Sequence, residues 1–187
     1  MKSIISFVFI IMFLTTIVSV YGQSEFKEYK GSLVEFQYPI EWESALKEGL
    51  NEYGSYVDKD KRVSFEIPNT NGAFTILIED TDRKNLEELL QEEIESHSNG
   101  DMEEILGTKE HILEITDTTL SNEPAKKVIV NVEELDNSLE DSKILTILNL
   151  HDNKRYSIVY RMDPASFDHY LPTIEKIIQS FKFTQNY

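Results

Sequence analysis

The chain closes on an apolar pattern that is typical of an amphipathic helix. From Phe167 onward, large apolar side chains recur every three or four residues, among them Ile174, Ile177 and Phe181. This spacing places them on one face of an α-helix. A helix with such a broad apolar face must cover another layer of structure. The closing segment therefore predicts a domain in which a helix covers one face of a β-sheet.

Pro172 interrupts this closing pattern. Proline removes an amide donor and disfavours the helical conformation at the residue before it. We therefore expect a short helical turn near residues 164–170 and the main helix from about Leu171 onward.

Much of the preceding sequence alternates between apolar and other residues, which predicts β-strands. The run at 142–150 is almost continuously apolar, which favours a central strand buried on both faces. One helical pattern, at 85–97, divides the strands into two groups. The predicted strands are 32–39, 62–68, 73–80, 111–120, 125–134, 142–150 and 156–162. This order predicts an α+β fold, with a largely antiparallel sheet and helices packed on it.

The helix predicted at 85–97 has both a start signal and an apolar face. Asn85 is a candidate N-cap, and Glu88 follows three residues later. Leu90 and Ile94 lie on the apolar face. His97 continues that face, so we expect this histidine to be packed in the interior.

The first 22 residues have the layout of a secretory signal peptide. Lys2 precedes an apolar run at residues 4–20, and a cut before Gln23 would follow small or tolerated residues. Removing the first 22 of the 187 residues leaves 165, which we expect to form a single domain, 23–187. The run just reaches the length of a membrane span, so an uncleaved N-terminal anchor is the alternative. Both alternatives predict a secreted or extracytoplasmic domain.

The chain is strongly acidic, with 34 acidic against 18 basic residues. Loss of Lys2 with the signal peptide gives the mature domain a formal net charge of −17. This charge repels phosphate backbones and anionic lipid surfaces, which argues against nucleic acid as a partner. Membrane contact is expected only through the N-terminal segment, if it is retained. The chain has no cysteine, which excludes disulfides and thiolate metal sites.

The sequence carries no recognisable catalytic motif. It has no Gly-x-Ser-x-Gly elbow, no cysteine nucleophile and no glycine-rich phosphate-binding loop. Paired carboxylates can be found in any chain this acidic, so a hydrolase is only the third interpretation. We therefore expect a protein that is not an enzyme and needs no cofactor.

A divalent cation such as Ca2+ is the alternative ligand. Residues 79–104 contain eleven acids, and a second acidic run spans 133–141. Carboxylate oxygens suit Ca2+. Glu88, Glu92 and Glu95 repel one another at three- and four-residue spacing on the predicted helix, and a bound cation would relieve that repulsion. A solvated acidic face is the other interpretation of the same three residues.

Aromatic side chains outside the clean strands form a second type of candidate site. Trp42, Tyr53 and Tyr56 lie in the irregular stretch 41–57. Aromatic residues are favoured at protein interfaces because they supply contact area at low entropy cost. These three residues therefore predict a partner-binding surface. For Trp42, the alternative is a side chain that closes the edge of the core.

Four short motifs occur in an order that resembles the PsbP-like family. They are FQYPIEW at 36–42, NLEELL at 85–90, NEPAKKV at 122–128 and the closing segment at 156–183. The resemblance covers nearly the whole mature chain and rests on the order and spacing of the motifs. It implies an α/β/α sandwich around an antiparallel sheet, used as a non-enzymatic, extracytoplasmic accessory domain.

The best-known members of that family are extrinsic subunits on the lumenal side of photosystem II, linked with retention of calcium and chloride. Another branch of the fold binds a small GTPase in the nucleus. The photosynthetic members dock partly through basic side chains, whereas this chain is acidic, so we do not carry their role over. The resemblance implies a binding or accessory module whose partner is a protein assembly in the cell envelope or at the outer membrane surface.

Overall fold

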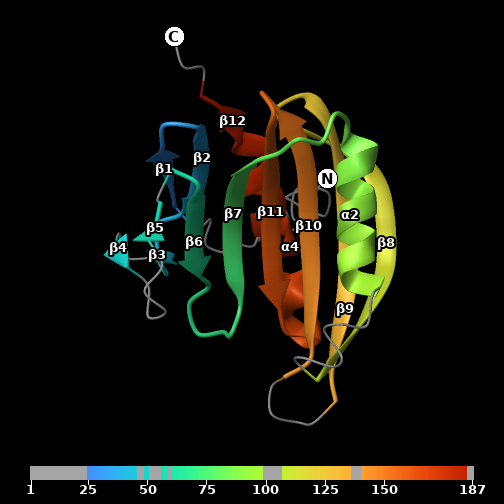
Figure 1. Ribbon diagram of the computed structural model, residues 1–187. Helices are drawn as coiled ribbons and strands as arrows, with labels where there is room; N and C mark the ends of the chain where they lie inside the picture. The colour runs from blue at the N-terminus through green and yellow to red at the C-terminus, as the bar shows by residue number, and fades with distance from the viewer. Residues whose placement is uncertain are drawn as a thin grey trace, which may run out of the picture.

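The computed structural model describes residues 25–45, 49–50, 56–58, 60–98, 107–135 and 140–184 (Figure 1). The helices in these ranges are α2 (Leu86–Ser98) and α4 (Pro164–Ser180). The strands are β1 (Phe26–Lys30), β2 (Val34–Pro39), β3 (Glu43–Ser44), β4 (Gly49–Leu50), β5 (Tyr56–Val57), β6 (Arg62–Glu66), β7 (Ala73–Asp80), β8 (Thr108–Leu120), β9 (Glu123–Glu134), β10 (Ser142–His151), β11 (Lys154–Met162) and β12 (Lys182–Phe183).

A seven-stranded sheet forms the centre of the fold, in the order β3-β6-β7-β11-β10-β9-β8. A smaller sheet has the order β1-β2-β12, and β4 pairs with β5. Every strand pair in the described part of the chain is antiparallel. The predicted antiparallel sheet is therefore confirmed, and β6 and β7 form a hairpin within it.

Tight turns connect the longest strand pairs. Ser121 and Asn122 join β8 to β9 with φ angles of 52° and 66°, and Asp152 and Asn153 join β10 to β11 with φ angles of 49° and 57°. Two consecutive left-handed residues are typical of a type I′ turn, whose twist matches that of the flanking strands. These turns therefore fix the register of both hairpins.

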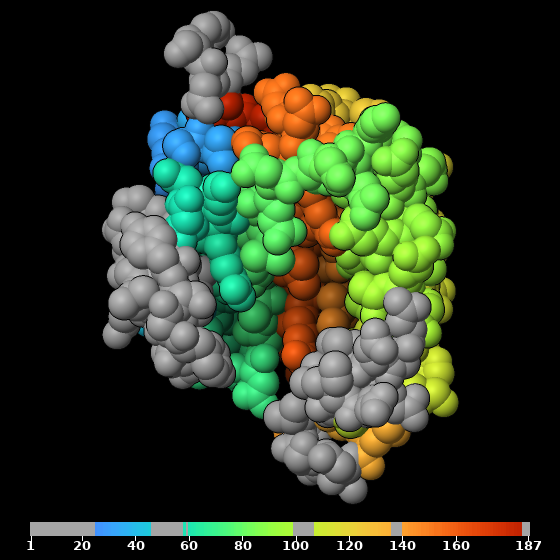
Figure 2. Space-filling view, viewed as in Figure 1, coloured from blue at the N-terminus to red at the C-terminus, as the bar shows by residue number. Residues whose placement is uncertain are grey.

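The two helices lie on opposite faces of the central sheet (Figure 1). α2 packs on β8, β9 and β10, whereas α4 packs on β2, β10 and β11. In Figure 2, β11 remains visible between β7 and α2. The helix α2 therefore covers only part of the sheet face on which it packs. α4 shares the opposite face with the small sheet.

Two apolar clusters hold these layers together. The main core lies between α4, the small sheet and the central sheet, and its aromatic centre includes Phe36 and Phe181, whose ring centroids are 6.4 Å apart. A smaller cluster lies beneath α2. In β10, Leu145 and Ile147 belong to the main core and Leu148 to the smaller cluster. This confirms the prediction that the strand is buried on both faces.

α4 is one continuous helix, so the predicted break at Pro172 is wrong. Pro172 lies on the exposed side of the helix, where water can bind the carbonyl that the proline leaves unpaired. Asp163 caps the helix by accepting a hydrogen bond from Ser166 N at 2.9 Å. Phe167 and Ile174 are buried on either side of the proline and keep both halves on the same core.

The fold is α+β, as predicted, but it is not a complete α/β/α sandwich. Among the described residues, strands dominate, α2 is the helix on one face, and α4 shares the other face with β1-β2-β12. Among the residues that the structure describes, no helix is both long and apolar enough to cross a bilayer. The apolar run at 4–20 lies outside the described residues, so its cleavage or anchoring stays a prediction.

Candidate functional site

The first candidate cation ligand on α2 caps its own helix. The carboxylate of Glu88 accepts hydrogen bonds from Lys84 N at 2.9 Å and from Asn85 Nδ2 at 3.0 Å. Glu88 N donates in turn to Asn85 Oδ1 at 2.9 Å. This arrangement confirms Asn85 as the N-cap.

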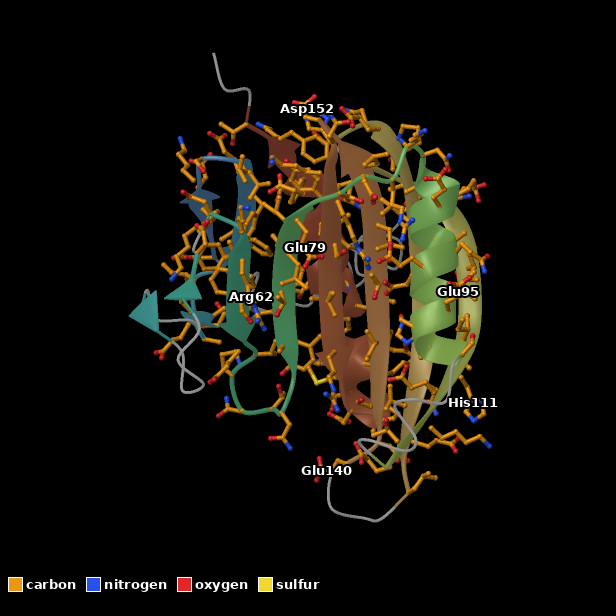
Figure 3. The ribbon with its side chains drawn as sticks, viewed as in Figure 1. Arg62, Glu79, Glu95, His111, Glu140 and Asp152 are labelled. Carbon is orange, nitrogen blue, oxygen red and sulfur yellow. The ribbon has the colours of Figure 1, made fainter. Side chains whose placement is uncertain are left out.

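The other two candidates have separate partners. Glu92 Oε2 accepts a hydrogen bond from Arg83 Nε at 3.2 Å. Glu95 lies on the outer side of α2 (Figure 3) and accepts a hydrogen bond from Gln91 Nε2 at 2.9 Å. Within the described ranges, no three His, Asp or Glu side chains are placed to hold a metal ion. The structure therefore does not assemble these three glutamates into a site, and Ca2+ binding stays a prediction.

Of the three aromatic candidates for partner binding, the structure describes the side chain of Trp42 alone, and that side chain is buried. The side chain of Trp42 is 2% exposed, and its ring centroid lies 6.1 Å from that of Phe74 in the main core. A buried indole offers no surface to a partner, so Trp42 is not an exposed binding residue and instead closes the edge of the core. Tyr53 lies outside the described residues, and Tyr56 is described only by its backbone in β5. A binding role for these two tyrosines stays a prediction.

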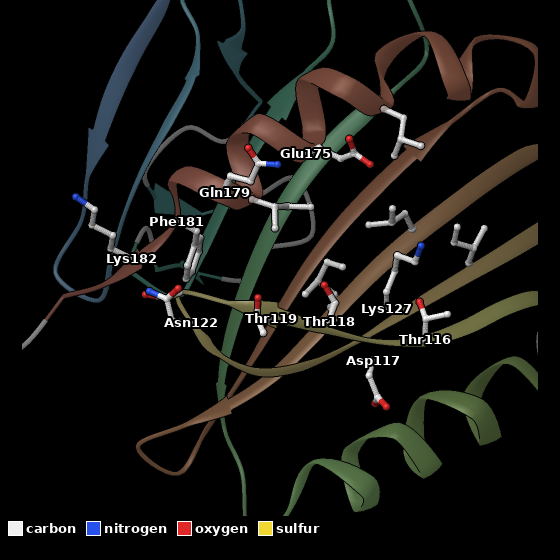
Figure 4. A pocket seen from close by; sticks show the side chains of 16 residues that line it. Thr116, Asp117, Thr118, Thr119, Asn122, Lys127, Glu175, Gln179, Phe181 and Lys182 are labelled. Atoms are coloured by element: carbon white, nitrogen blue, oxygen red, sulfur yellow. The ribbon is translucent and has the colours of Figure 1, made fainter.

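A groove of about 650 Å³ lies between α4 and β8 (Figure 4). β8 and the turn that follows it form one wall, α4 forms the other, and β9 and β10 form the floor. The layering explains the groove. Because α4 packs mainly on β2, β10 and β11, the last two strands of the sheet extend beyond the helix.

The floor of this groove is apolar. Ile129, Leu145 and Ile147 belong to the main core and form its base. Leu171 and Ile178 line the α4 side and are only partly buried. These five side chains leave apolar surface open to a ligand of suitable shape.

The rim of the groove is polar and carries both signs of charge. Lys127 lies on the sheet side, and Glu175 and Lys182 lie on the other side. Lys127 Nζ lies 2.7 Å from Glu114 Oε1. Its hydrogen bond lowers the pKa of the Glu114 carboxyl, against the opposing effect of desolvation. The charge of Lys127 is therefore already compensated within the protein.

The chemistry of this lining suits binding better than catalysis. The 16 side chains drawn in Figure 4 supply hydroxyls, amides, carboxylates and amines, but no histidine. Histidine is the commonest general acid and base, and its absence removes the simplest route to proton transfer. An apolar floor with a polar rim instead suits a ligand that has one apolar and one polar side.

Sequence reasoning missed this groove because its residues come from distant strands and a helix. The available signal was the width of the apolar stripe on α4. Phe167, Ile174 and Ile177 are fully buried, whereas Leu171 and Ile178, at its flank, are not. A stripe wider than the sheet contact indicates surface left over for another molecule.

No protein-family model matches the sequence, and no curated protein sequence matches it. Several solved structures resemble the fold, among them the following three. Cyanobacterial PsbP (CyanoP) from Synechocystis sp. PCC 6803 has 15% identity and a TM-score of 0.59, over 88% of this chain and 96% of that chain. The Ran-binding protein Mog1p of Saccharomyces cerevisiae has 15% identity and a TM-score of 0.56, over 85% and 95%. PA94 of Pseudomonas aeruginosa has 11% identity and a TM-score of 0.54, over 87% and 99%.

These similarities span nearly the whole of each compared chain, while the identities are low. They therefore concern the arrangement of helices and strands and carry no residue from one protein to another. The order of motifs read from the sequence points to the same arrangement. The chain has the PsbP-like fold.

Proposed function

We propose that this chain is a non-enzymatic protein-binding module that works outside the cytoplasm, with the groove between α4 and β8 as its binding surface. The groove carries this proposal because its floor is apolar and its rim is polar. A polypeptide segment that places apolar side chains inward and polar groups outward matches both parts. Such a segment would bury the flank of α4 formed by Leu171 and Ile178.

The charge of the domain indicates the chemistry of the partner. A mature chain of −17 attracts basic surfaces, and complementary charge speeds encounter and suppresses wrong partners. Glu175 lies on the α4 rim, where it can pair with a basic side chain of a bound segment. The proposed partner is therefore a protein segment with apolar residues flanked by Lys or Arg.

Two further observations support the proposal. Mog1p, which has a similar fold, is described as a Ran-binding protein, so this fold can serve protein binding. The apolar run at 4–20 has the layout of a signal peptide, which supports a place outside the cytoplasm. Neither observation names the partner of this chain.

A pair of matched glutamine substitutions tests the groove. Gln179 lines the groove from α4, and Gln91 is exposed on α2 at a distance from the groove lining. Gln179→Arg puts a bulky cation where a basic partner segment should lie, whereas Gln91→Arg adds the same charge elsewhere. Tagged wild-type and variant proteins are purified from native cells under mild detergent, and bound proteins are quantified by mass spectrometry.

We expect one recurrent partner of the wild type to be lost from Gln179→Arg and retained by Gln91→Arg, with equal melting temperatures for the variants. Equal retention by both variants would contradict the groove as the binding surface. Recovery of the wild-type protein alone would contradict the module itself and would direct attention to cation titration.

A further inference from the structure

The contact between α2 and the central sheet is only partly apolar. Its apolar part joins α2 to the valines and other aliphatic residues of the sheet, and its members are Leu86, Leu90, Ile94, Ile112, Val128, Val130, Val132, Ile144 and Leu148. Charged side chains lie beside this apolar part, with acids of α2 facing cations of the sheet. The docking of α2 therefore depends on charge as well as on apolar burial.

Two cations of the sheet bind acids of α2. Lys126 Nζ on β9 lies 2.7 Å from Glu87 Oε1. Arg155 Nη2 on β11 donates a hydrogen bond to Glu93 Oε2 at 2.6 Å. Lysine and arginine lose their protons only far above neutral pH. These two contacts therefore stay charged through the range in which histidine titrates.

His97 makes the third charged contact, near the end of α2. Its Nδ1 lies 2.5 Å from Glu110 Oε2 on β8, and its Nε2 lies 3.4 Å from Glu93 Oε1. The side chains of His97 and Glu110 are only 13% and 9% exposed. An imidazole donates from both nitrogens only when it is protonated. The geometry is therefore that of an imidazolium between two carboxylates.

When the imidazole loses its proton, a cation remains near one of the two carboxylates but not near the other. Glu93 keeps the charge of Arg155 at 2.6 Å. Glu110 has no cation other than His97 within ion-pair distance among the described residues. Deprotonation therefore leaves a nearly buried carboxylate on β8 without a counter-charge, which is costly in a poorly solvated site.

We propose that His97 is a proton-dependent clasp, which holds the C-terminal half of α2 on β8 while the imidazole is charged and loosens that contact when the proton is lost. The bistable element is α2, whose contact with the sheet is partly apolar and partly charged. Loosening would expose the valine side chains of β9 beneath the helix. The clasp acts on the face of the sheet opposite to α4 and does not depend on the groove.

The direction of the pH dependence follows from the two buried partners. The hydrogen bond that His97 donates to Glu93 raises the pKa of His97, and the contact with Glu110 adds to this effect, while desolvation opposes it. Desolvation alone would raise the pKa of Glu93, but His97 and Arg155 outweigh it, and the pKa of Glu93 is lowered. The histidine contribution is therefore complete below its unfolded pKa of about 6.5 and is lost as pH rises through the higher folded pKa.

The other charged groups on this face do not replace the clasp. By strand alternation, Glu134 on β9 lies on the same face as Val132, and it pairs with Thr108, two register positions beyond the pair of Glu110 and Val132. Asp117 on β8 lies 2.7 Å from Lys126 at the other end of the helix. Among the residues that the structure describes, no other histidine forms an ion pair with α2, so His97 is the group here that ordinarily titrates near neutral pH.

Hydrogen exchange of the backbone amides of α2 tests the clasp. Protection factors, corrected for intrinsic exchange, are measured from about pH 5.5 to about pH 9.5, a range that spans the titration of histidine. In the wild type, we expect protection of residues 93–98 to fall several-fold across this range, while protection of β10 changes little. Constant protection of α2 across the range would overturn the proposal.

Matched substitutions identify the proton responsible. Glu110→Gln keeps a hydrogen-bonding side chain but removes the charge, so the pH dependence of α2 protection should largely disappear. The control is His111→Gln on the same strand, where His111 Nε2 lies 3.9 Å from Glu133 Oε2 and both side chains are nearly half exposed. His111→Gln should leave the pH dependence unchanged. Equal effects of the two substitutions would overturn the assignment to His97.

A direct titration keeps the proposal testable if Glu110→Gln fails to fold. The imidazole nitrogens of His97 are followed by NMR in the wild-type protein across the same pH range. We expect the pKa of His97 to lie above the ordinary imidazole value of about 6.5, and the loss of α2 protection to follow the titration of His97. A His97 that titrates at or below about 6.5 would overturn the clasp.

Discussion

At the scale of single residues, burial separates the side chains that hold the fold from those that can meet a partner. Trp42 and Ile40 are two residues apart, and their exposed fractions are 2% and 52%. Trp42 packs against Phe74 in the aromatic core, whereas Ile40 lies at the surface after β2. Neither outcome follows from residue type, because both side chains are large and apolar.

Trp42→Ala should therefore destabilise the domain strongly. Loss of a buried indole removes its contacts and leaves a cavity, which typically costs about 3–5 kcal/mol in the free energy of unfolding. Ile40→Ala is the neighbouring control and should change that free energy by less than about 0.5 kcal/mol. Urea denaturation of both variants measures the difference. Similar small losses for the two would contradict the placement of Trp42 in the core.

The sequence predicted which side chains are buried where apolar residues recur at a regular spacing. It predicted burial poorly where they show no regular spacing. The three- and four-residue spacing identified Phe167, Ile174 and Ile177 as the buried face of α4, and the structure confirms them. The stretch 41–57 has no period, so nothing in it distinguished a buried Trp42 from an exposed one. Burial there depends on how the chain crosses the end of the core, which only the folded structure fixes.

At the scale of elements, α4 shows how tertiary packing overrides a local preference. Pro172 costs the helix one hydrogen bond, yet the helix continues from Pro164 to Ser180. Buried residues before and after the proline contact the same core, so a break would forfeit apolar burial on both sides. The helix is therefore continuous in spite of its sequence.

Pro172→Ala should stabilise the domain. Alanine restores the amide donor within the helix. Proline stabilises the folded state only by restricting the unfolded chain, which contributes about 0.4–1 kcal/mol to the free energy of unfolding. Since proline in a helix interior costs about 3 kcal/mol, we expect a net gain of about 2–2.6 kcal/mol in the free energy of unfolding. Gln179→Ala, at an exposed position of the same helix, is the control and should be nearly neutral. A loss of stability for Pro172→Ala would show that the proline fits the helix without strain.

At the scale of the whole molecule, an uneven cover of the sheet creates the candidate site. On one face of the central sheet, α2 covers the end that contains β8. On the opposite face, α4 and the small sheet cover the part that contains β10 and β11. The groove lies where α4 leaves β8 and β9 uncovered. Sequence patterns predicted the layers but not this offset, because the offset depends on how helices and strands from distant parts of the chain meet.

The acidic domain should lose stability in acid through its paired carboxylates. Hydrogen bonds from Lys154 and Lys61 lower the pKa of Asp80 to about 2. A carboxyl with a lowered folded pKa stabilises the protein above its unfolded pKa and loses that contribution as pH falls through the folded pKa. We expect the urea midpoint to fall from about pH 4 towards about pH 2, and Asp80→Asn to make part of that fall disappear. An unchanged midpoint over this range would contradict the role of these pairs.

Photo-crosslinking in native cells tests most directly whether the groove binds a protein. A photoreactive amino acid replaces Thr116, which lines the groove from β8, or Gln91, which is exposed on α2. Crosslinked products are identified by mass spectrometry, which also shows whether the mature chain begins at Gln23. We expect one recurrent extracytoplasmic protein to be crosslinked from position 116 and not from position 91. The same products from both positions, or none from position 116, would contradict a protein-binding groove.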